Sequence, residues 1–342
     1  MSQAIRTNYQ YQTTQEMRAI NPEYVRVLTA NRPTFNLFPI VNSNKWELIW
    51  RQKDNWRGFQ QLRGLNGEPS YVKMVGEGMF SAKPGVWGEY MTLDEEEMTK
   101  RAEETPEGEP IDVQDLVAER NEYLAAREID LIEYIHWQAL LNGTYTFLGP
   151  LGAVYKDTFP IQTQTLSDWS VPSTATPIAD LRALFAFTEG KSVVFNSQAG
   201  LWMNRKTANY LLANTNAADL GGFKVNNLNE IKTMEQINQI LVANDLPQVN
   251  IYDLGYFRES DGAFQKWIPD DKVVLIGART DGSALGEYRM VRNAVNPGRE
   301  PGSYVKVIDR TEERVPPIIE VHRGHNGGLV IFYGSAIMRL NV

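Results

Sequence analysis

The sequence contains no cysteine, only three histidines among 342 residues, and no excess of basic side chains. Without cysteine there can be no disulfide, no thiolate nucleophile and no cysteine-ligated zinc. His322 and His325 form an H-x-x-H pair in a glycine-rich segment, but no third ligand follows at the spacing of a zinc site. The net charge of −8 also disfavours binding to a phosphate backbone. These absences argue against nucleic-acid binders and against the commonest metal and thiol enzymes.

Long apolar runs and catalytic motifs are absent as well. The longest apolar stretch, GGLVIFYGSAIM, has about twelve residues, which is too short to cross a bilayer. The polar start, MSQAIRTNYQYQTTQEM, shows no secretory signal. Neither a G-x-S-x-G nucleophile elbow nor a P-loop occurs. We therefore expect a soluble protein made in the cytoplasm, without a catalytic site, a cofactor or a bound metal.

The dominant feature that is present is one long helical segment, residues 112–143. It predicts a helix of about eight turns, roughly 45 Å long, which exceeds the diameter of a small domain. Asp112 is a suitable N-cap, and Asn142 with Gly143 provides a stop. Apolar side chains are sparse in the N-terminal half, whereas a second apolar face joins in the last three turns. The pattern predicts a rod that lies across a sheet.

The segments before this helix are polar, strand-like or rich in glycine. Residues 1–44 are polar and broken by three prolines, so we expect an arm with little core of its own. KWELIWRQ predicts a strand with one buried face. Seven glycines within residues 58–88, with an Asn-Gly turn signal at 66–67, favour a projecting hairpin over a surface loop. VWGEYMTL would return beside the first strand, and the acidic run after it would be a solvated linker.

Downstream of the long helix, the pattern predicts helices that alternate with strands. Helices are expected in PIADLRALFAF, in SQAGLWMNRKTANYLLAN and in NLNEIKTMEQINQIL, the last with a capping box between Asn227 and Glu230. Strands are expected in KSVVFNSQ, on both sides of a hairpin at Asp261-Gly262, and in GGLVIFYGSAIMRLNV, taken as one strand that crosses a sheet. Together these elements predict an α+β protein.

An arm, a projecting hairpin and an over-long helix share one property: none of them can bury its apolar surface within a single chain. Such elements become stable when they pack on further copies of the same chain, as in closed symmetric oligomers and shells. The order of elements therefore favours a structural role over an enzymatic one.

Three passages carry a family resemblance: SVVFNSQAGLWMNRKTANYLL, YFRESDGAFQKWIPDDKVVLIG and, at the end of the long helix, LLNGTYTF. In order and content they resemble the major capsid protein of lambda-like tailed bacteriophages, the capsid protein E family. The order of elements is similar from about residue 45 onward. The likeness between individual residues is concentrated in 111–150 and 191–280.

The resemblance implies an α+β fold of the Hong Kong-phage major capsid type, divided into five parts. These are an N-terminal arm (1–44), an extended loop with its base strands (45–93), a peripheral domain (94–190) with the spine helix 112–142, an axial domain (191–325) and a C-terminal strand that returns to the main sheet (326–342). The extended loop would lie over a neighbouring copy. The candidates for contact between subunits are Phe59, Leu62, Tyr71, Val72 and Met79, together with Trp46 and Trp50.

The resemblance also implies a function. Many copies would form the hexameric and pentameric capsomers of an icosahedral head shell, assembled in the host cytoplasm and present in the virion. The implied partners are further copies of the chain, a scaffold, a portal and a decoration or cement protein. Packaged double-stranded DNA would be enclosed without sequence-specific binding, and no membrane would be involved.

Two alternatives stay open at this point. An encapsulin-like nanocompartment would share the fold but enclose a cargo enzyme instead of DNA. A metal-dependent or carboxylate-based enzyme would have to use the acidic run together with His322 and His325. The first alternative differs from the phage shell in its contents, and the second differs in its chemistry.

Overall fold

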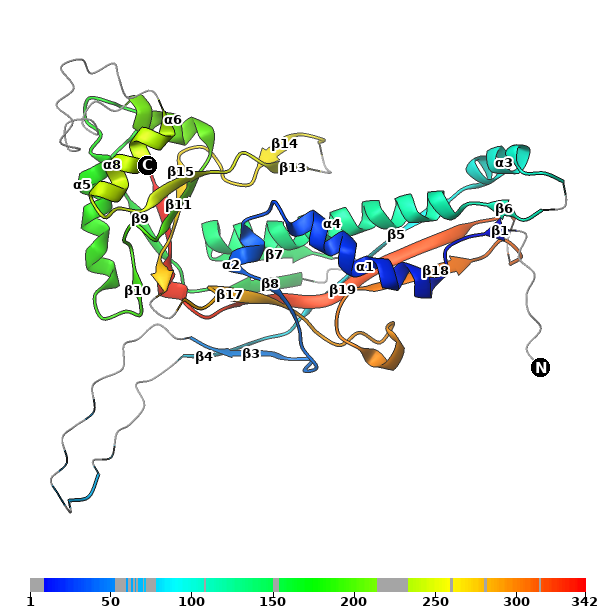
Figure 1. Ribbon diagram of the computed structural model, residues 1–342, viewed down its shortest axis with the longest axis horizontal. Coiled ribbons are helices and arrows are strands. Elements are labelled where there is room, and N and C mark those ends of the chain that lie inside the picture. Colours follow the sequence, from blue (N-terminus) through cyan, green and yellow to red (C-terminus); the bar gives the residue numbers. More distant parts are fainter. Residues whose placement is uncertain are drawn as a thin grey trace. The chain divides into compact units, whose positions relative to one another are not determined.

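The computed structural model describes residues 9–52, 60, 63, 65, 67–69, 71, 78–107, 109–149, 154–213, 233–258, 261–279, 282–313 and 315–342. The chain divides into two compact units, each made of three segments that are far apart in the sequence. Unit 1 comprises Met1–Leu48, Ala82–Glu133 and Glu287–Val330, and unit 2 comprises Ile49–Ser81, Tyr134–Gly286 and Ile331–Val342. The elements are labelled in Figure 1.

Unit 1 is built on a five-stranded sheet around the long strand β19 (Ile319–Ile331). On one side β19 pairs antiparallel with β5 (Gly85–Leu93) over nine register positions. Its other neighbours are β18 (Tyr304–Asp309) and β17 (Gly286–Met290), and β17 pairs in parallel with β2 (Ile40–Asn42). The predicted strand VWGEYMTL is therefore correct as a strand. Its expected partner is wrong, because β5 pairs with β19 whereas the strand in KWELIWRQ, β3 (Leu48–Arg51), pairs with β4 (Met79–Ala82).

Two helices cover one face of this sheet, as Figure 1 shows for α1 (Thr14–Thr29) and α4 (Gln114–Asn142) along β19. Met17 of α1 and Val117 of α4 are buried with Ile319 and Val321 in one apolar cluster. The expectation of an arm with little core is wrong for the part containing α1. A capping box between Thr13 and Glu16 starts this helix, which continues through a proline.

The acidic run also forms a helix, α3 (Glu95–Glu104), instead of the expected linker. Asp94 caps it, and three glutamates in its first turn lie where the helix dipole favours negative charge. Met98 anchors it, since this side chain is buried in the apolar cluster of unit 1. One apolar residue among many charges was too weak a periodic signal to predict this packing.

Unit 1 also contains α2 (Thr34–Leu37) and a parallel pair of short strands, β1 (Tyr9–Gln10) and β6 (Ile111–Asp112).

The long helix is confirmed as α4, with its start shifted by two residues. Asp112 belongs to β6, and its Oδ1 accepts a hydrogen bond from the backbone N of Gln114 at 3.0 Å. The stop at Gly143 is also confirmed, because Gly143 adopts φ +64° and donates to the carbonyl of Ala139 at 3.0 Å. Residues 114–133 of α4 lie in unit 1 and residues 134–142 in unit 2.

Unit 2 contains a second five-stranded sheet. In order across the sheet its strands are β12 (Gln248–Ile251), β11 (Gly200–Met203), β15 (Lys272–Ile276), β20 (Ile337–Asn341) and β9 (Gln162–Thr165). The inner pairs β11–β15 and β15–β20 are antiparallel, whereas β12 and β9 add in parallel at the edges. The strand order does not follow the chain order, so this sheet depends on contacts between distant segments.

Helices cover one face of this sheet, and the end of α4 covers the other. The helices are α5 (Pro177–Ala183), continued by a 3-10 turn (Leu184–Thr188), α6 (Arg205–Ala213) and α8 (Met234–Ala243). Leu201 and Met203 of β11 are buried among them. Trp202, which points the opposite way, lies 6.4 Å from Trp137 of α4 between ring centroids. The confirmed helix at Pro177 contributes side chains to the same apolar cluster as Leu201 and Met203.

Two predicted boundaries in this region are wrong, and a third falls partly outside the described residues. The helix expected in residues 197–214 is the strand β11 followed by α6, with Asn204 at the junction accepting a hydrogen bond from Thr207 N at 2.8 Å. The helix α8 begins after Thr233, whose capping partner is Gln236, whereas the predicted capping box at 227–230 lies outside the described residues. The C-terminal strand is two strands, β19 and β20, separated by a 3-10 turn at Gly334–Ala336.

The remaining strands form two-stranded ribbons. They are β3 (Leu48–Arg51) with β4 (Met79–Ala82), β7 (Thr144–Leu148) with β8 (Val154–Thr158), β10 (Val193–Val194) with β16 (Ala278–Arg279), and β13 (Gly255–Phe257) with β14 (Phe264–Lys266). The hairpin predicted at Asp261-Gly262 is confirmed, and Gly262 adopts φ +64°. None of the helices described here is long and apolar enough to span a membrane.

Residues 287–325, which the sequence analysis assigned to the axial domain, pair with β5 and β2 in unit 1. Residues 331–342 of the predicted C-terminal strand lie in unit 2, where β20 joins the second sheet. The two compact units therefore cut across the predicted segments. The functional roles of those segments stay predictions.

Candidate assembly surface

The predicted contact residues differ sharply in exposure. Tyr71 is 92% exposed, Met79 on β4 is 67% exposed, and Trp46, just before β3, is 51% exposed. The other loop candidates, Phe59, Leu62 and Val72, lie outside the described residues. Large apolar side chains that remain in water are unusual in monomers when they gather in patches, and they are typical of surfaces that bind a partner.

Trp50 has a different place from the other candidates, because it is only 7% exposed. Its ring stacks on Phe80 of β4 at 5.6 Å and lies 6.3 Å from Phe159, all within unit 2. The side chain therefore anchors the β3–β4 ribbon to its own subunit and leaves little surface for a neighbouring copy. Alternation in KWELIWRQ predicted one buried face correctly, but it placed Trp46 and Trp50 on that face together.

The base of the ribbon is held together by its backbone. Gln52 N donates to the carbonyl of Gly78 at 3.0 Å, one step beyond the paired strands. Residues 52 and 78 are thus direct neighbours across the ribbon, although 25 residues separate them in the sequence. The two ends of the intervening segment therefore lie side by side, whereas the predicted hairpin itself lies mostly outside the described residues.

A second exposed region, on β5, was not predicted. Val86 and Tyr90 are exposed on the sheet face opposite α4, and the Tyr90 ring stacks on His322 of β19 at 5.0 Å. Within the described part of the chain β5 pairs only with β19, so its outer edge offers hydrogen-bonding groups to another strand. The alternation of GVWGEYMTL marked two faces, but only the sheet order shows that β5 is an edge strand.

A third exposed apolar pair lies on the β13–β14 hairpin of unit 2. Phe257 and Phe264 are cross-strand partners whose ring centroids are 5.5 Å apart, and both side chains are exposed. Leu254, just before the hairpin, is exposed as well. Such a pair stabilises the hairpin only weakly in water. Its apolar surface would gain more by packing on another molecule.

The framework behind β5 is a buried polar cluster between α4 and β19. Arg323 Nε donates to Glu128 Oε2 at 2.6 Å, and Arg323 Nη1 donates to Asn121 Oδ1 at 3.2 Å. His325 Nδ1 lies 2.8 Å from Glu128 Oε1, which also accepts from Ser303 Oγ at 2.5 Å. Because the charges are buried and paired, each partner depends on the others. The cluster fixes the helix on the strand at one register.

Electrostatics in this cluster favour the ionised carboxylate. Burial by itself raises the pKa of Glu128, but the positive charge of Arg323, the neighbouring His325 and the hydroxyl of Ser303 lower the pKa to about 2. Glu128 is therefore negative at neutral pH. His325 also lies 2.8 Å, at Nε2, from the hydroxyl of Tyr288, so the cluster continues into β17.

The H-x-x-H pair of His322 and His325 does not converge on one site. Residues three apart on a strand lie on opposite faces, so His322 is placed beside Glu320 at 2.9 Å while His325 is buried. Burial lowers the pKa of His136 to about 3, which keeps this side chain neutral at neutral pH. Among the described residues no group of three His, Asp or Glu side chains could hold a metal ion.

No model of a protein family matches the sequence, and no curated protein matches it. Solved structures do match. One is assigned as a prophage capsid protein of E. coli CFT073, with a TM-score of 0.56, 15% identity and coverage of 97% of this chain and 99% of that chain. Another is a phage-related protein of Bordetella bronchiseptica RB50, with a TM-score of 0.54, 11% identity and coverage of 94% and 96%. The chain therefore has the α+β, Hong Kong-phage-type fold over nearly its whole length.

Proposed function

We propose that this chain is a major capsid protein, the subunit of an icosahedral head shell that encloses a phage genome. The observation that carries the proposal is the end-to-end structural likeness to the prophage protein of E. coli CFT073. Since the likeness covers almost all of both chains, it is a likeness of whole subunits and not of one shared domain. A subunit of this kind acts by its geometry and its contacts with other copies.

The exposed apolar side chains support this proposal. They occur at the β3–β4 ribbon, on β5 and on the β13–β14 hairpin, so they are distributed over both units. A subunit that meets several neighbours in a closed shell needs contact surfaces of this kind in more than one place. A monomeric enzyme would instead gather its functional side chains around one site.

Within phage capsid proteins, we assign the chain to the lambda-like branch, on the strength of the passages 192–212 and 256–277 and of the end of α4. The partners would then be further copies in hexameric and pentameric capsomers, a scaffold, a portal, a decoration or cement protein, and packaged double-stranded DNA. The five segments would act as the arm, extended loop, peripheral domain, axial domain and returning strand.

Assembly of the purified chain, together with a shortened variant, tests the proposal. The expressed protein should form closed particles by size-exclusion chromatography and negative-stain electron microscopy. The variant replaces residues 53–77 by Asn-Gly, a two-residue turn that suits the hydrogen-bonded neighbours Gln52 and Gly78. It should remain folded by circular dichroism and stay unassembled, because the loop that covers a neighbouring copy is gone.

The matched control carries a Gly/Ser linker of the same length as the replaced segment, which separates the effect of loop sequence from that of loop closure. Normal particles from the variant with the two-residue turn would contradict the role of the loop. Failure of the full chain to form particles under any scaffold condition would contradict the shell itself. Nuclease-protected DNA in particles from infected cells would distinguish a phage head from an encapsulin-like compartment, which would hold protein cargo.

A further inference from the structure

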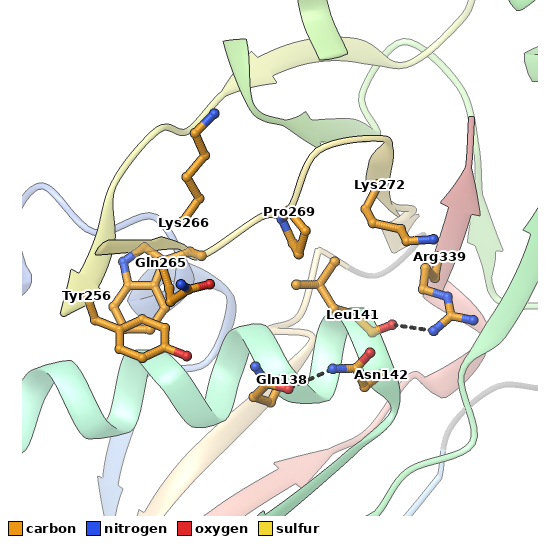
Figure 2. A pocket seen from close by; sticks show the side chains of 10 residues that line it. Gln138, Leu141, Asn142, Tyr256, Gln265, Lys266, Pro269, Lys272 and Arg339 are labelled. Atoms are coloured by element: carbon orange, nitrogen blue, oxygen red, sulfur yellow. Dashed lines mark hydrogen bonds between the residues drawn. The ribbon is translucent and has the colours of Figure 1, made fainter. Parts of the chain in front are cut away.

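Unit 2 contains a cavity of about 230 Å³ beside the end of α4, shown from close by in Figure 2. It is lined by residues of four separate chain segments, namely Gln138, Leu141, Asn142, Tyr256, Gln265, Lys266, Trp267, Pro269, Lys272 and Arg339. The cavity is large enough for one amino-acid side chain or a small organic acid. Nothing in the proposed shell function assigns it a role.

The lining carries three cations and no carboxylate. Lys266 has an acidic partner just outside the cavity, since its Nζ lies 3.3 Å from Asp270 Oδ1. The other two cations have neutral partners: Lys272 Nζ donates to Asn341 Oδ1 at 2.8 Å, and Arg339 Nη1 donates to the carbonyl of Leu141 at 3.3 Å. Within the described part of the chain, neither of these two cations forms an ion pair with a carboxylate, although the net charge of the protein is −8.

Arg339 also has an unused donor. Its Nε is buried and has no hydrogen-bond partner within the described residues. A buried donor without a partner costs free energy, so such atoms are usually satisfied by water or by a ligand. The planar Nε and Nη donors of arginine match the two oxygens of a carboxylate or the oxygens of a phosphate. The geometry points to an oxyanion next to Arg339 and Lys272.

The rest of the lining is suited to an organic stem. Tyr256 and Trp267 stack at 4.9 Å and form an aromatic wall, and Leu141 and Pro269 add apolar surface. Gln138, Asn142 and Gln265 contribute amides. An aliphatic chain of two or three carbons would bury its surface on such a wall while its charged end met the cations.

We propose that this cavity binds a carboxylate on a short aliphatic stem, such as the side chain of glutamate. A carboxylate is favoured over phosphate because α4 ends at the cavity, and a helix C-terminus carries partial negative charge that penalises a dianion. Phosphate sites more often use helix N-termini and backbone N–H groups. The carboxylate could be supplied by a free dicarboxylic acid or by an acidic side chain of a second copy of this chain.

Calorimetric titration of the unassembled full-length chain tests the site, with capped glutamate (N-acetylglutamate N-methylamide) as the probe. Saturable binding is expected. Capped glutamine, its neutral isostere, should bind the parent chain at least about tenfold more weakly than capped glutamate. Capped glutamate should bind the Lys272→Met variant more weakly by the same factor, since a charge-assisted hydrogen bond is worth about 1.4 kcal/mol or more. Absence of saturable binding, equal binding of capped glutamine, or tighter binding of inorganic phosphate would each overturn the proposal.

Two further variants keep the result interpretable. Lys306→Met removes the same charge from an exposed position on β18 in unit 1 and should bind capped glutamate like the parent chain. Lys272→Arg keeps the charge and should restore binding lost in Lys272→Met. If Lys272→Arg binds as weakly as Lys272→Met while both unfold at the parent's temperature, charge at this position is not what holds the ligand, and the proposal fails.

Titration of assembled particles then identifies the source of the carboxylate. If a second copy supplies it, the cavity is filled in particles and capped glutamate no longer binds there. If a free acid is the ligand, particles bind the probe like the unassembled chain. Because the first titration uses unassembled protein, a chain that binds capped glutamate but forms no particles would contradict the proposed shell function and leave the carboxylate site intact.

Discussion

At the scale of single residues, the carboxylate of Glu128 holds α4 on β19. It accepts hydrogen bonds from Arg323 and Ser303 and lies next to His325 in a buried site. Burying charge is costly unless every charge is paired, so removing one member leaves the others uncompensated. The residues come from positions 128, 303, 323 and 325 of the sequence, and no local pattern relates them.

The variant Glu128→Gln should destabilise the subunit by about 3–5 kcal/mol, because it leaves the Arg323 guanidinium buried without an anion. Urea unfolding at neutral pH measures the loss. Glu122→Gln makes the same chemical change at an exposed position of α4 and should cost less than about 0.5 kcal/mol. Equal stabilities of the two variants would show that the buried ion pair does not hold the helix in place.

Acid should weaken the same cluster. The pKa of Glu128 is about 2 in the folded chain and 4.5 by its ordinary value, so the unfolded chain binds the proton first as the pH falls. Its contribution to stability is complete above pH 4.5 and is lost as the pH falls through 2. A pH series of urea unfolding should show this loss in the parent chain and not in Glu128→Gln.

His136 predicts a separate pH dependence at higher pH. Its pKa is about 3 in the folded chain, against an ordinary 6.5, so protonation of the unfolded chain removes stability as the pH falls below 6.5. The expected loss attributable to His136 is about 1.4 kcal/mol between pH 7.5 and 5.5, a window above the titration of Glu128. His136→Gln should lose this part of the pH dependence. A variant with the parent's full pH dependence would show that His136 does not cause it.

At the scale of elements, two tryptophans at the β3–β4 ribbon have different places, one in the core and one at the surface. The alternating pattern of the sequence could not distinguish them. Trp50 is buried against Phe80 and Phe159, whereas Trp46 is half exposed. Trp50→Ala should therefore cost about 3–5 kcal/mol of stability, the usual cost of deleting a buried aromatic side chain. Thermal and urea unfolding of the unassembled chain measure it.

Trp46→Ala is the matched change just before the same ribbon. It should cost about 1 kcal/mol or less in unfolding while it reduces the yield of particles, if the exposed ring contacts a neighbouring copy. A variant that assembles as well as the parent would remove Trp46 from the contact surface. The pair of variants thus separates folding from assembly on one element.

The elements that could be predicted are those whose signal is local. The helix α4 has its period, its stop at Gly143 and its uneven apolar coverage within one continuous stretch, and all three are confirmed. The hairpin at Asp261-Gly262 is set by its turn residues. In contrast, the segment Gly200–Met203 is a strand because β12 and β15 lie on either side of it, and those strands come much later in the chain.

At the scale of the whole molecule, the charge balance predicts how the subunit meets DNA. With a net charge of −8, the chain has no excess cations to release counterions from a duplex. The purified protein should not retard double-stranded DNA in a gel at low salt, where electrostatic binding is strongest. Saturable retardation that disappears in higher salt would contradict a shell that encloses DNA without gripping it.

The candidate surfaces could be predicted only in part. The exposure of Tyr71 and Met79 agrees with the glycine-rich composition around them, whereas the predicted hairpin lies mostly outside the described residues. That β5 lies at the edge of its sheet, among the described strands, could not be predicted, because strand order depends on pairing between distant segments. The cavity at the end of α4 could not be predicted from the sequence either, because its cations, at positions 266, 272 and 339, come from separate parts of the chain.

The sequence by itself determined the α+β class, the long helix, the confirmed hairpin and the absence of cysteine chemistry, because each depends on composition or on neighbours within a few residues. Tertiary structure decided which strands share a sheet, that Trp50 is core while Trp46 is surface, and where Glu128, Arg323 and His325 meet. These outcomes depend on burial and on pairing between distant segments. Local periodicity carries no information about either.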